Sequence, residues 1–280
     1  MSPAPPLRIA SRANPLWVRL RKLAQDSTQY RKTGDIWLEG EHLCRAATAR
    51  GRTVTQAVLA ESAWDDPALR ALARPAARIV VMPAALFAAL SALESPARIG
   101  FLIGHDAAPP IDAHATTVVL DRLQDAGNVG SLLRSAAALG VVQVLALKGT
   151  AALWSPKVLR AGMGAHFGLR LIEALDLTDL DALRVPLVAT SSHAAQALPG
   201  AALPSPCAWV FGHEGQGVDA ALLARCALTV RIPQPGGEES LNVAAAAAIC
   251  LYESACRRMS SAALPDFAPP SAGGRTGGAR

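Results

Sequence analysis

The chain has few aromatic residues: they make up 4% of its 280 residues, although 51% are hydrophobic. A core made mostly of alanine, leucine and valine favours close packing of helices on sheets rather than large aromatic clusters. No apolar run approaches the roughly 20 residues needed to span a bilayer. The N-terminal segment also lacks the hydrophobic region of a signal peptide. The sequence therefore predicts a soluble, cytoplasmic protein.

Cysteine is sparse and scattered. The five cysteines are odd in number and no Cys-x-x-Cys pair occurs, so the sequence gives no sign of a disulfide framework or a zinc site. None of the six histidines forms a pair at metal-ligand spacing. We therefore expect no bound metal.

Acidic residues are nearly absent from one stretch near the N-terminus. Between Arg8 and Lys32 the only acid is Asp26, and the net charge of the whole chain is +5. Besides Arg8, the basic residues of this stretch are Arg12, Arg19, Arg21, Lys22, Arg31 and Lys32. Such a cluster favours contact with an anionic partner. Taken alone, the stretch is explained equally well as a solvated basic helix face.

The hydrophobic pattern divides the chain into two α/β units. Residues 1–105 form the first unit, and residues 106–115, rich in proline and alanine, are the predicted linker. The first unit is expected to contain a helix within 12–33, a strand turning into a helix over 35–51, strands at 53–62 and 77–82, and helices at 66–75 and 85–93.

Strands and helices alternate regularly in residues 116–260, which predicts a parallel sheet with helices on its faces. The expected strands are 117–123, 141–147, 187–192, 209–212 and 228–233, and the expected helices are 128–140, 155–164, 219–226 and 240–259. Residues 261–280 are rich in proline, glycine, serine and alanine and predict a disordered tail.

Ligands of parallel sheets gather at the carboxyl ends of the strands, and three such ends here are rich in polar residues and glycine. The first, "DAGNVGSLLR", places Asn128 and Arg134 on roughly the same helical face, although an N-cap and a surface charge would explain each alone. The second, "GHEGQG", holds Glu214 between glycines, where a structural hydrogen bond is the simpler role for that residue taken alone. The third places Ser240 and Asn242 before a helix that needs only one capping side chain.

The glycine-rich second segment does not match the known nucleotide-binding loops. No Gly-Lys-Ser/Thr follows it, and the third glycine of the dinucleotide fingerprint is missing. A nucleotide-binding α/β protein is therefore disfavoured.

Together and in this order, the three segments resemble the motifs of the SpoU (TrmH-like) RNA ribose 2′-O-methyltransferases of the SPOUT superfamily. Those motifs run approximately Asp-x-Pro-x-Asn-x-Gly-x-x-x-Arg, Gly-x-Glu-x-x-Gly and Ile-Pro…Ser-Leu-Asn-Val. They appear here as "DAGNVGSLLR", "GHEGQG" and "IPQPGGEESLNVAAA". The segment "SRANPLWVRLRKLAQDSTQYRKTGDIWLEGEHLCRAA" is similar to the family's substrate-binding domain. Three positions depart from the pattern: Ala126 replaces proline, His213 replaces asparagine or alanine, and Gly162 replaces a frequent serine.

The resemblance implies a deep trefoil knot in the C-terminal unit, a homodimer formed through that unit, and S-adenosylmethionine bound largely through backbone groups. By position it assigns the cofactor to Thr190, Gly212, Gly217, Ile232, Pro233 and Leu241. It assigns catalysis to Asn128, Arg134, Glu214, Ser240 and Asn242.

The implied substrate is RNA, and the basic N-terminal residues become candidate RNA contacts. We expect 23S ribosomal RNA; transfer RNA, or a catalytically inactive RNA-binding paralogue, are the alternatives. Because arginine is always protonated, we interpret Arg134 as an electrostatic group that lowers the pKa of the ribose 2′-OH or anchors the 3′-phosphate. The proton acceptor is left open.

Overall fold

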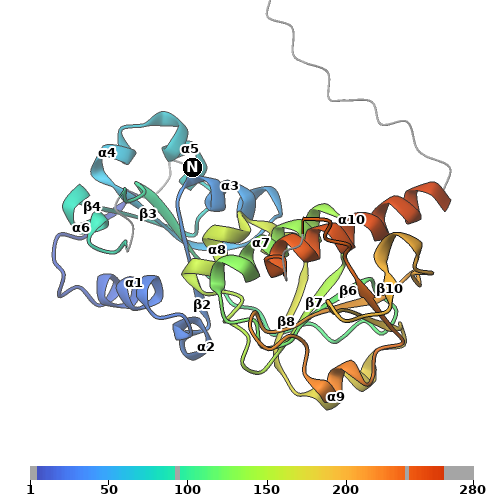
Figure 1. Ribbon diagram of the computed structural model, residues 1–280. Coiled ribbons are helices and arrows are strands. Elements are labelled where there is room, and N and C mark those ends of the chain that lie inside the picture. Colours follow the sequence, from blue (N-terminus) through green and yellow to red (C-terminus); the bar gives the residue numbers. More distant parts are fainter. Residues whose placement is uncertain (1–4, 92–94, 237–239, 262–280) are drawn as a thin grey trace, which may run out of the picture.

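Two sheets, one in each half of the chain, organise the molecule. The computed structural model describes residues 5–91, 95–236 and 240–261, so residues 262–280 of the predicted tail lie outside the described residues. Figure 1 shows the N-terminal unit, in blue and teal, beside the C-terminal unit, in green to red. No helix within the described ranges is long and apolar enough to cross a membrane.

The N-terminal unit is a mixed five-stranded sheet with the strand order β1–β4–β3–β5–β2. β1, β4 and β3 run parallel, and β5 is antiparallel to both of its neighbours. The strands are β1 (Leu7–Arg8), β2 (Asp35–Glu39), β3 (Val54–Ala60), β4 (Arg78–Met82) and β5 (Ile99–Gly104). The helices are α1 (Pro15–Gln25), α2 (Gln29–Thr33), α3 (Glu41–Ala49), α4 (Glu61–Trp64), α5 (Pro67–Ala73) and α6 (Ala84–Ala88).

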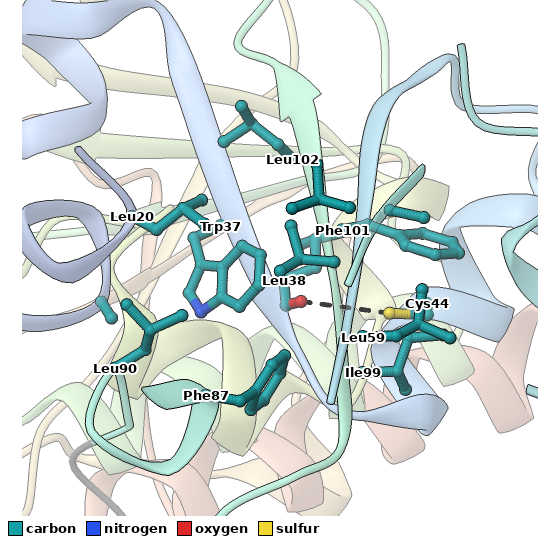
Figure 2. Packing of buried hydrophobic residues seen from close by; sticks show 14 of the residues in the cluster. Leu20, Trp37, Leu38, Cys44, Leu59, Phe87, Leu90, Ile99, Phe101 and Leu102 are labelled. Carbon is teal, nitrogen blue, oxygen red and sulfur yellow. Dashed lines mark hydrogen bonds between the residues drawn. The ribbon is translucent and has the colours of Figure 1, made fainter. Parts of the chain in front are cut away.

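The core of this unit is built around Trp37 on β2. Figure 2 shows its indole among Leu20, Phe87 and Leu90, with the Phe87 ring 6.2 Å away between centroids. Gly100 on β5 leaves the space that the indole fills, because a Cβ there would lie 2.2 Å from the ring. Trp37 and Phe87 therefore form an aromatic contact within a core that otherwise consists mainly of alanine, leucine and valine, as the composition predicts.

The C-terminal unit is a seven-stranded sheet, parallel throughout, with the strand order β10–β12–β9–β11–β6–β7–β8. This confirms the predicted parallel α/β fold. The strands are β6 (Thr117–Leu120), β7 (Gln143–Leu147), β8 (Arg170–Leu175), β9 (Leu187–Thr190), β10 (Gln196–Ala197), β11 (Ala208–Phe211) and β12 (Leu228–Arg231). The helices are α7 (Ala126–Ala138), α8 (Pro156–Gly162), α9 (Ala220–Leu223) and α10 (Val243–Ser261), with three short 3₁₀ turns, η1 (Ala165–Gly168), η2 (Leu177–Ala182) and η3 (Leu198–Gly200).

The strand order brings the three motifs to one edge of this sheet. β12, β9, β11 and β6 are consecutive neighbours and all run in the same direction. The first motif follows β6, the second follows β11 and the third follows β12. Their carboxyl ends therefore form one continuous edge, where ligands of parallel sheets bind.

The two units are in direct contact. Residues 105–116 contain no helix or strand, and they span the predicted linker. α8 of the C-terminal unit packs against β2 and α1, and Ala152 and Leu159 join the buried core of the N-terminal unit. Tyr30 of α2 donates a hydrogen bond to Glu173 of β8. The predicted division into domains at residues 1–105 and 116–260, with a linker at 106–115, stays a prediction.

Candidate active site

The loop of residues 212–218, after β11, is closed by backbone hydrogen bonds. The N–H of His213 donates to the carbonyl of Gly217 at 3.0 Å, and the N–H of Gly217 donates back at 2.8 Å. Position 212 accepts only glycine, because a Cβ on Gly212 would lie 2.2 Å from the backbone nitrogen of Val218. The glycines thus let the chain turn back tightly at the strand end.

Glu214, within this loop, reaches the start of α7. Its carboxylate accepts hydrogen bonds from the N–H groups of Gln124 (3.4 Å) and Asp125 (3.3 Å) and from the side-chain amide of Asn128 (3.2 Å). Partial desolvation raises the pKa of the Glu214 carboxyl, but its hydrogen bonds to backbone N–H groups and to Asn128 outweigh that effect and hold the pKa below its ordinary value. Glu214 is therefore suited to position Asn128 and poorly suited to accept a proton.

Asn128 continues the connection to the third motif. Its Oδ1 accepts a hydrogen bond from Nδ2 of Asn242 at 2.8 Å. The Oδ1 of Asn242 accepts from the N–H groups of Ala244 (2.9 Å) and Ala245 (3.3 Å), so Asn242 caps α10. One chain of hydrogen bonds therefore joins Glu214, Asn128 and Asn242, one residue from each motif.

Both helix starts differ from those expected. α7 begins at Ala126, because Asp125 accepts a hydrogen bond from the N–H of Asn128 at 2.7 Å and is the N-cap. An N-cap role for Asn128 is therefore wrong. α10 begins at Val243, and residues 240–242 belong to the preceding loop.

A pocket of about 610 Å³ opens at this edge of the sheet. Glu214 and Asn242 line it, and Asn128 is bonded to both of them. The wall is built from residues 190–193, 212–218, 223, 232, 234, 240–243 and 246. The pocket therefore adjoins the hydrogen-bond chain that links the three motifs.

The structure gathers most of the predicted cofactor and catalytic residues around this pocket. The predicted cofactor residues that line it are Thr190, Gly212, Gly217, Ile232 and Leu241. Pro233 is not among the lining residues and lies in the loop after β12. The predicted catalytic residues in the wall are Glu214, Ser240 and Asn242.

Gln234 is a wall residue that the sequence reasoning missed. Its Oε1 is buried and has no hydrogen-bond partner in the part of the chain that the structure describes. A buried amide oxygen without a partner is costly, so it is suited to accept a hydrogen bond from a ligand in the pocket. The only signal in the sequence is its place directly after the "IP" of the third motif.

Arg122, also missed, holds the end of β6 against the 212–218 loop. Its φ of +58° lies in the left-handed region, which non-glycine residues rarely adopt. Its guanidinium donates to both carboxylate oxygens of Asp121 at 2.9 and 3.1 Å and to Oε1 of Gln216 at 3.2 Å. These contacts compensate the strained backbone, and no sequence motif marks the residue.

Arg134 lies outside the pocket. Asn128 and Arg134 both belong to α7, and six residues at 3.6 per turn leave the side chains roughly 120° apart around the helix. The expectation of a shared helical face is therefore wrong. Arg134 is exposed and does not line the pocket, and its side chain makes no hydrogen bond or ion pair with any described residue.

Two of the six residues predicted to bind RNA have carboxylate partners inside the chain. Arg31 donates through Nε to Glu173 at 3.1 Å, from one unit to the other. Arg19 pairs with Asp35, a buried residue at the start of β2. Both arginines thus stabilise the fold, and their contact with RNA stays a prediction.

The other four basic residues make no ion pair with a described carboxylate, although Arg21 is half-buried and donates a hydrogen bond to the carbonyl of Ala89. The guanidinium groups of Arg12 and Arg21 lie 6.0 and 5.4 Å from the ring centre of Trp17. Lys22 and Lys32 are exposed, and their side chains make no hydrogen bond or ion pair with the described residues. The lysines are therefore the freest candidates for RNA contact in this segment.

The described residues contain no group of three or more histidine, cysteine, aspartate or glutamate side chains that could hold a metal ion. The expectation that no metal binds stays a prediction.

Comparison with known proteins agrees with this architecture. Residues 115–252 match the model of the SpoU rRNA Methylase family. An uncharacterized tRNA/rRNA methyltransferase of Synechocystis is 34% identical over 92% of this chain and 96% of its own length. The 23S rRNA (guanosine(2553)-2′-O)-methyltransferase RlmP of Bacillus subtilis is 30% identical over 79% of this chain and 88% of its own length.

Solved structures give the same result. The crystal structure of an RNA 2′-O ribose methyltransferase superposes with a TM-score of 0.77 at 31% identity, covering 90% of this chain and 100% of the other. AviRb of Streptomyces viridochromogenes with AdoMet has a TM-score of 0.81 at 24% identity, covering 88% of this chain and 99% of the other, and supports the fold alone. The fold is that of the SpoU-type methyltransferases. The chain belongs to the SpoU rRNA methylase family.

Proposed function

We propose that this protein transfers a methyl group from S-adenosylmethionine to the 2′-OH of a ribose in ribosomal RNA. The observation that carries the proposal is the hydrogen-bond chain of Glu214, Asn128 and Asn242 beside the pocket. Its members come from three separate motifs, and they converge only because four adjacent strands end at one edge. The similarity to the B. subtilis 23S rRNA 2′-O-methyltransferase supports the substrate class.

The pocket fits S-adenosylmethionine. Its volume of about 610 Å³ lies within the roughly 300–1,000 Å³ of small-molecule sites. The close backbone turn at Gly212 and the unpaired Oε1 of Gln234 suit a ligand held mainly by backbone groups and one amide. Thr190, Ile232 and Leu241 would form the remaining wall around it. When bound, the cofactor supplies an electrophilic methyl group on a sulfonium centre.

The residues of the chain then have to align a weakly acidic ribose hydroxyl with that methyl group. Alignment of two reactants accounts for a large share of the barrier in such reactions. Asn128 and Asn242 are held in fixed orientations by Glu214 and by the α10 N-terminus. They are suited to orient the ribose, and Ser240 lines the pocket beside them. Glu214 is in this account a positioning residue.

Arg134 would stabilise the developing alkoxide or hold the neighbouring phosphate. Because it lies outside the pocket of its own chain, a site completed by a second subunit would account for its position. The homodimer expected from the family resemblance is supported by one face of α10. That face, the α10 stripe, is formed by Ala245, Ile249, Tyr252, Cys256 and Met259.

The alternatives are distinguished by activity. A transfer RNA substrate leaves the same site in use, whereas an inactive paralogue would bind RNA without transferring a methyl group. The intact set of Asn128, Arg134, Glu214 and Asn242 favours an active enzyme. The trefoil knot and the cytoplasmic location stay predictions.

The role of the motif residues is tested by methyl transfer under saturating S-adenosylmethionine. We expect Arg134→Ala to lower kcat by about 10²–10³-fold, the usual cost of removing one electrostatic donor, with an unchanged Kd for the cofactor. The matched control is Arg184→Ala. Arg184 precedes β9 and so lies at the amino ends of the strands, and it does not line the pocket. Full activity of the Arg134→Ala protein would refute the assigned role. Cofactor binding by the unaltered protein without transfer to any RNA would favour the inactive paralogue.

A further inference from the structure

A second cavity, of about 690 Å³, lies between the two units of the molecule. We name it the interdomain cleft. The N-terminal unit contributes the end of α1 and the turn after it, through Ala24, Gln25 and Ser27. The C-terminal unit contributes residues 124–127, before and within the first turn of α7, and residues 151–152, 155–157 and 160, before and within α8. Figure 1 shows α7 and α8 at the junction of the two units.

Two basic side chains and one acidic side chain line the interdomain cleft, so the net charge of its lining is positive. The side chains of Lys157 and Arg160 line it, and neither side chain makes a hydrogen bond or ion pair with a described residue. Arg160 is half-buried and Lys157 exposed. The one acidic lining residue, Asp125, already accepts the N–H of Asn128 as the cap of α7. A pair of cations without acidic partners favours an anionic ligand.

The cleft adjoins the candidate active site. Gln124 and Asp125 line the cleft, and their backbone N–H groups donate hydrogen bonds to the carboxylate of Glu214. Glu214 in turn holds Asn128 and lines the cofactor pocket. One segment of chain therefore separates the two cavities, and a ligand in the cleft lies next to the groups that face the ribose.

The two walls of the cleft are fixed relative to each other. Glu173 accepts hydrogen bonds from Tyr30 and Arg31 of the N-terminal unit and, at 2.9 Å, from the N–H of Leu153, which precedes α8. At the other end of α8, the Nε2 of His42 lies 3.1 Å from the carbonyl oxygen of Met163. The side chain of Glu173 is only 13% exposed. The cleft is therefore preformed and does not need a domain movement to open.

The lining also narrows the kind of ligand. It offers the amides of Gln25 and Gln124 and the hydroxyl of Ser27, and its other walls are largely alanine, glycine and proline. The lining residues include no aromatic side chain on which a base could stack. The volume exceeds what a single phosphate needs and falls in the range of nucleotide-sized ligands. These features suit a sugar–phosphate backbone better than a base.

We propose that the interdomain cleft holds the sugar–phosphate backbone of the RNA strand next to the methylated nucleotide, with Lys157 and Arg160 each contacting a phosphate. The inference rests on the proposed function and adds to it a path for the substrate. Lys22 extends that path, because it lies three residues before Gln25 on nearly the same side of α1. The strand thus runs from the free lysine of α1 through the cleft to Asn128.

The experiment compares a cleft variant with a control variant of equal charge in the full-length protein. The cleft variant is Lys157→Ala with Arg160→Ala, and the control is Arg74→Ala with Arg78→Ala, which removes two exposed arginines of the N-terminal unit outside the cleft. RNA affinity is titrated over a salt series with a ribosomal RNA fragment, and methyl transfer is measured on the same RNA. Thermal melting checks that each protein is folded.

The cleft variant should raise the KM for RNA at least fivefold and leave kcat and the cofactor Kd within twofold. The slope of the logarithm of RNA affinity against the logarithm of salt concentration should become shallower by about 1.4, since each single-strand phosphate contact contributes about 0.7. The control should change neither the KM for RNA nor the salt slope. The charge-conserving variant, Lys157→Arg with Arg160→Lys, should keep the salt slope of the unaltered protein. Equal slopes and KM values in the cleft variant and the control would overturn the proposal. Absence of methyl transfer by the unaltered protein would instead count against the proposed function, and the salt slopes would still decide the cleft.

Discussion

Gly162 and His166 form a tightly packed pair behind α8. A Cβ on Gly162 would lie 2.6 Å from Cε1 of His166. The His166 ring is buried, and its Nε2 donates a hydrogen bond to the carbonyl oxygen of Leu153 at 2.8 Å. The serine frequent at this position in the family would therefore collide with the ring. The departure at Gly162 is explained by the histidine four residues later.

The buried ring of His166 makes stability depend on pH. Burial lowers its pKa from 6.5 to about 4, against the opposing effect of the hydrogen bond to Leu153. Between pH 6.5 and 4 the unfolded chain binds a proton that the folded chain does not. The free energy of unfolding should therefore fall as the pH falls through this window, by at most about 3 kcal/mol.

The comparison with His166→Gln isolates this contribution. Denaturant titrations at pH 7, 6 and 5 should show the variant less stable at pH 7, with a gap that narrows as the pH falls. A gap that stays constant across the three pH values would contradict a neutral buried histidine.

His213, a second departure from the family pattern, stabilises the loop that holds Glu214. Its Nδ1 accepts hydrogen bonds from the N–H groups of Gly215 at 3.0 Å and Gln216 at 3.3 Å. The ring thus satisfies two backbone donors of a tight turn. The sequence marked the position as unusual, but only the coordinates show which atoms the imidazole contacts.

At the scale of elements, α7 begins without the proline usual in the family. Asp125, the cap, has φ −75° and ψ 116°, an extended conformation that a following proline allows. Ala126 occupies the first helical position, where the N–H has no partner within the helix and proline is favoured.

Ala126→Pro should therefore stabilise the protein. We expect the free energy of unfolding to rise by about 0.4–1 kcal/mol, because proline restricts the unfolded chain without strain in the folded one. Ala137→Pro, in the last turn of the same helix, is the control and should lower it by about 3 kcal/mol. A loss of stability in the first variant, measured by urea titration, would show that the start of α7 is described incorrectly.

The strands and helices that carry strong patterns could be predicted from the sequence, whereas several others, among them β5 and β8, could not. The parallel sheet and the order of the motifs followed from the alternation of apolar runs. β8, an edge strand, was missed because "RLIEAL" fits a helix as well as a strand, and its pairing with β7 shifts register near Ala174 at φ +62°. β5 was missed because it precedes the proline-rich linker directly.

At the scale of the molecule, the contacts between the two units had no local signal. Tyr30 and Glu173 are 143 residues apart, and nothing in either segment indicates the partner. The charge of Arg31 suggested RNA, whereas its position in the fold pairs it with Glu173. The convergence of Asn128, Glu214 and Asn242 could be predicted, because the family motifs contain all three residues. The position of Arg134 outside the pocket could not be predicted from those motifs.

The α10 stripe should form the homodimer interface. Its members recur at alternating intervals of four and three residues, and the side chains of Ile249, Tyr252 and Met259 are 41%, 60% and 40% exposed. Such spacing places apolar groups on one face of a helix. Tyr252→Glu would bury a charge in the interface.

Light scattering should therefore find the unaltered protein as a dimer and Tyr252→Glu as a monomer at micromolar concentration. Val142→Glu is the matched control, since Val142 is 44% exposed and lies outside α10, and it should stay dimeric. Dimers of Tyr252→Glu as stable as those of the unaltered protein would place the interface elsewhere.

The central claim is that the methyl group reaches a ribose oxygen of ribosomal RNA. The direct measurement incubates the purified protein and labelled S-adenosylmethionine with 23S ribosomal RNA from cells lacking the enzyme. The RNA is then digested, and the labelled nucleosides are identified by mass spectrometry. We predict a single 2′-O-methylated nucleoside in 23S RNA, with no label in transfer RNA. Label on a base, or label confined to transfer RNA, would contradict the account.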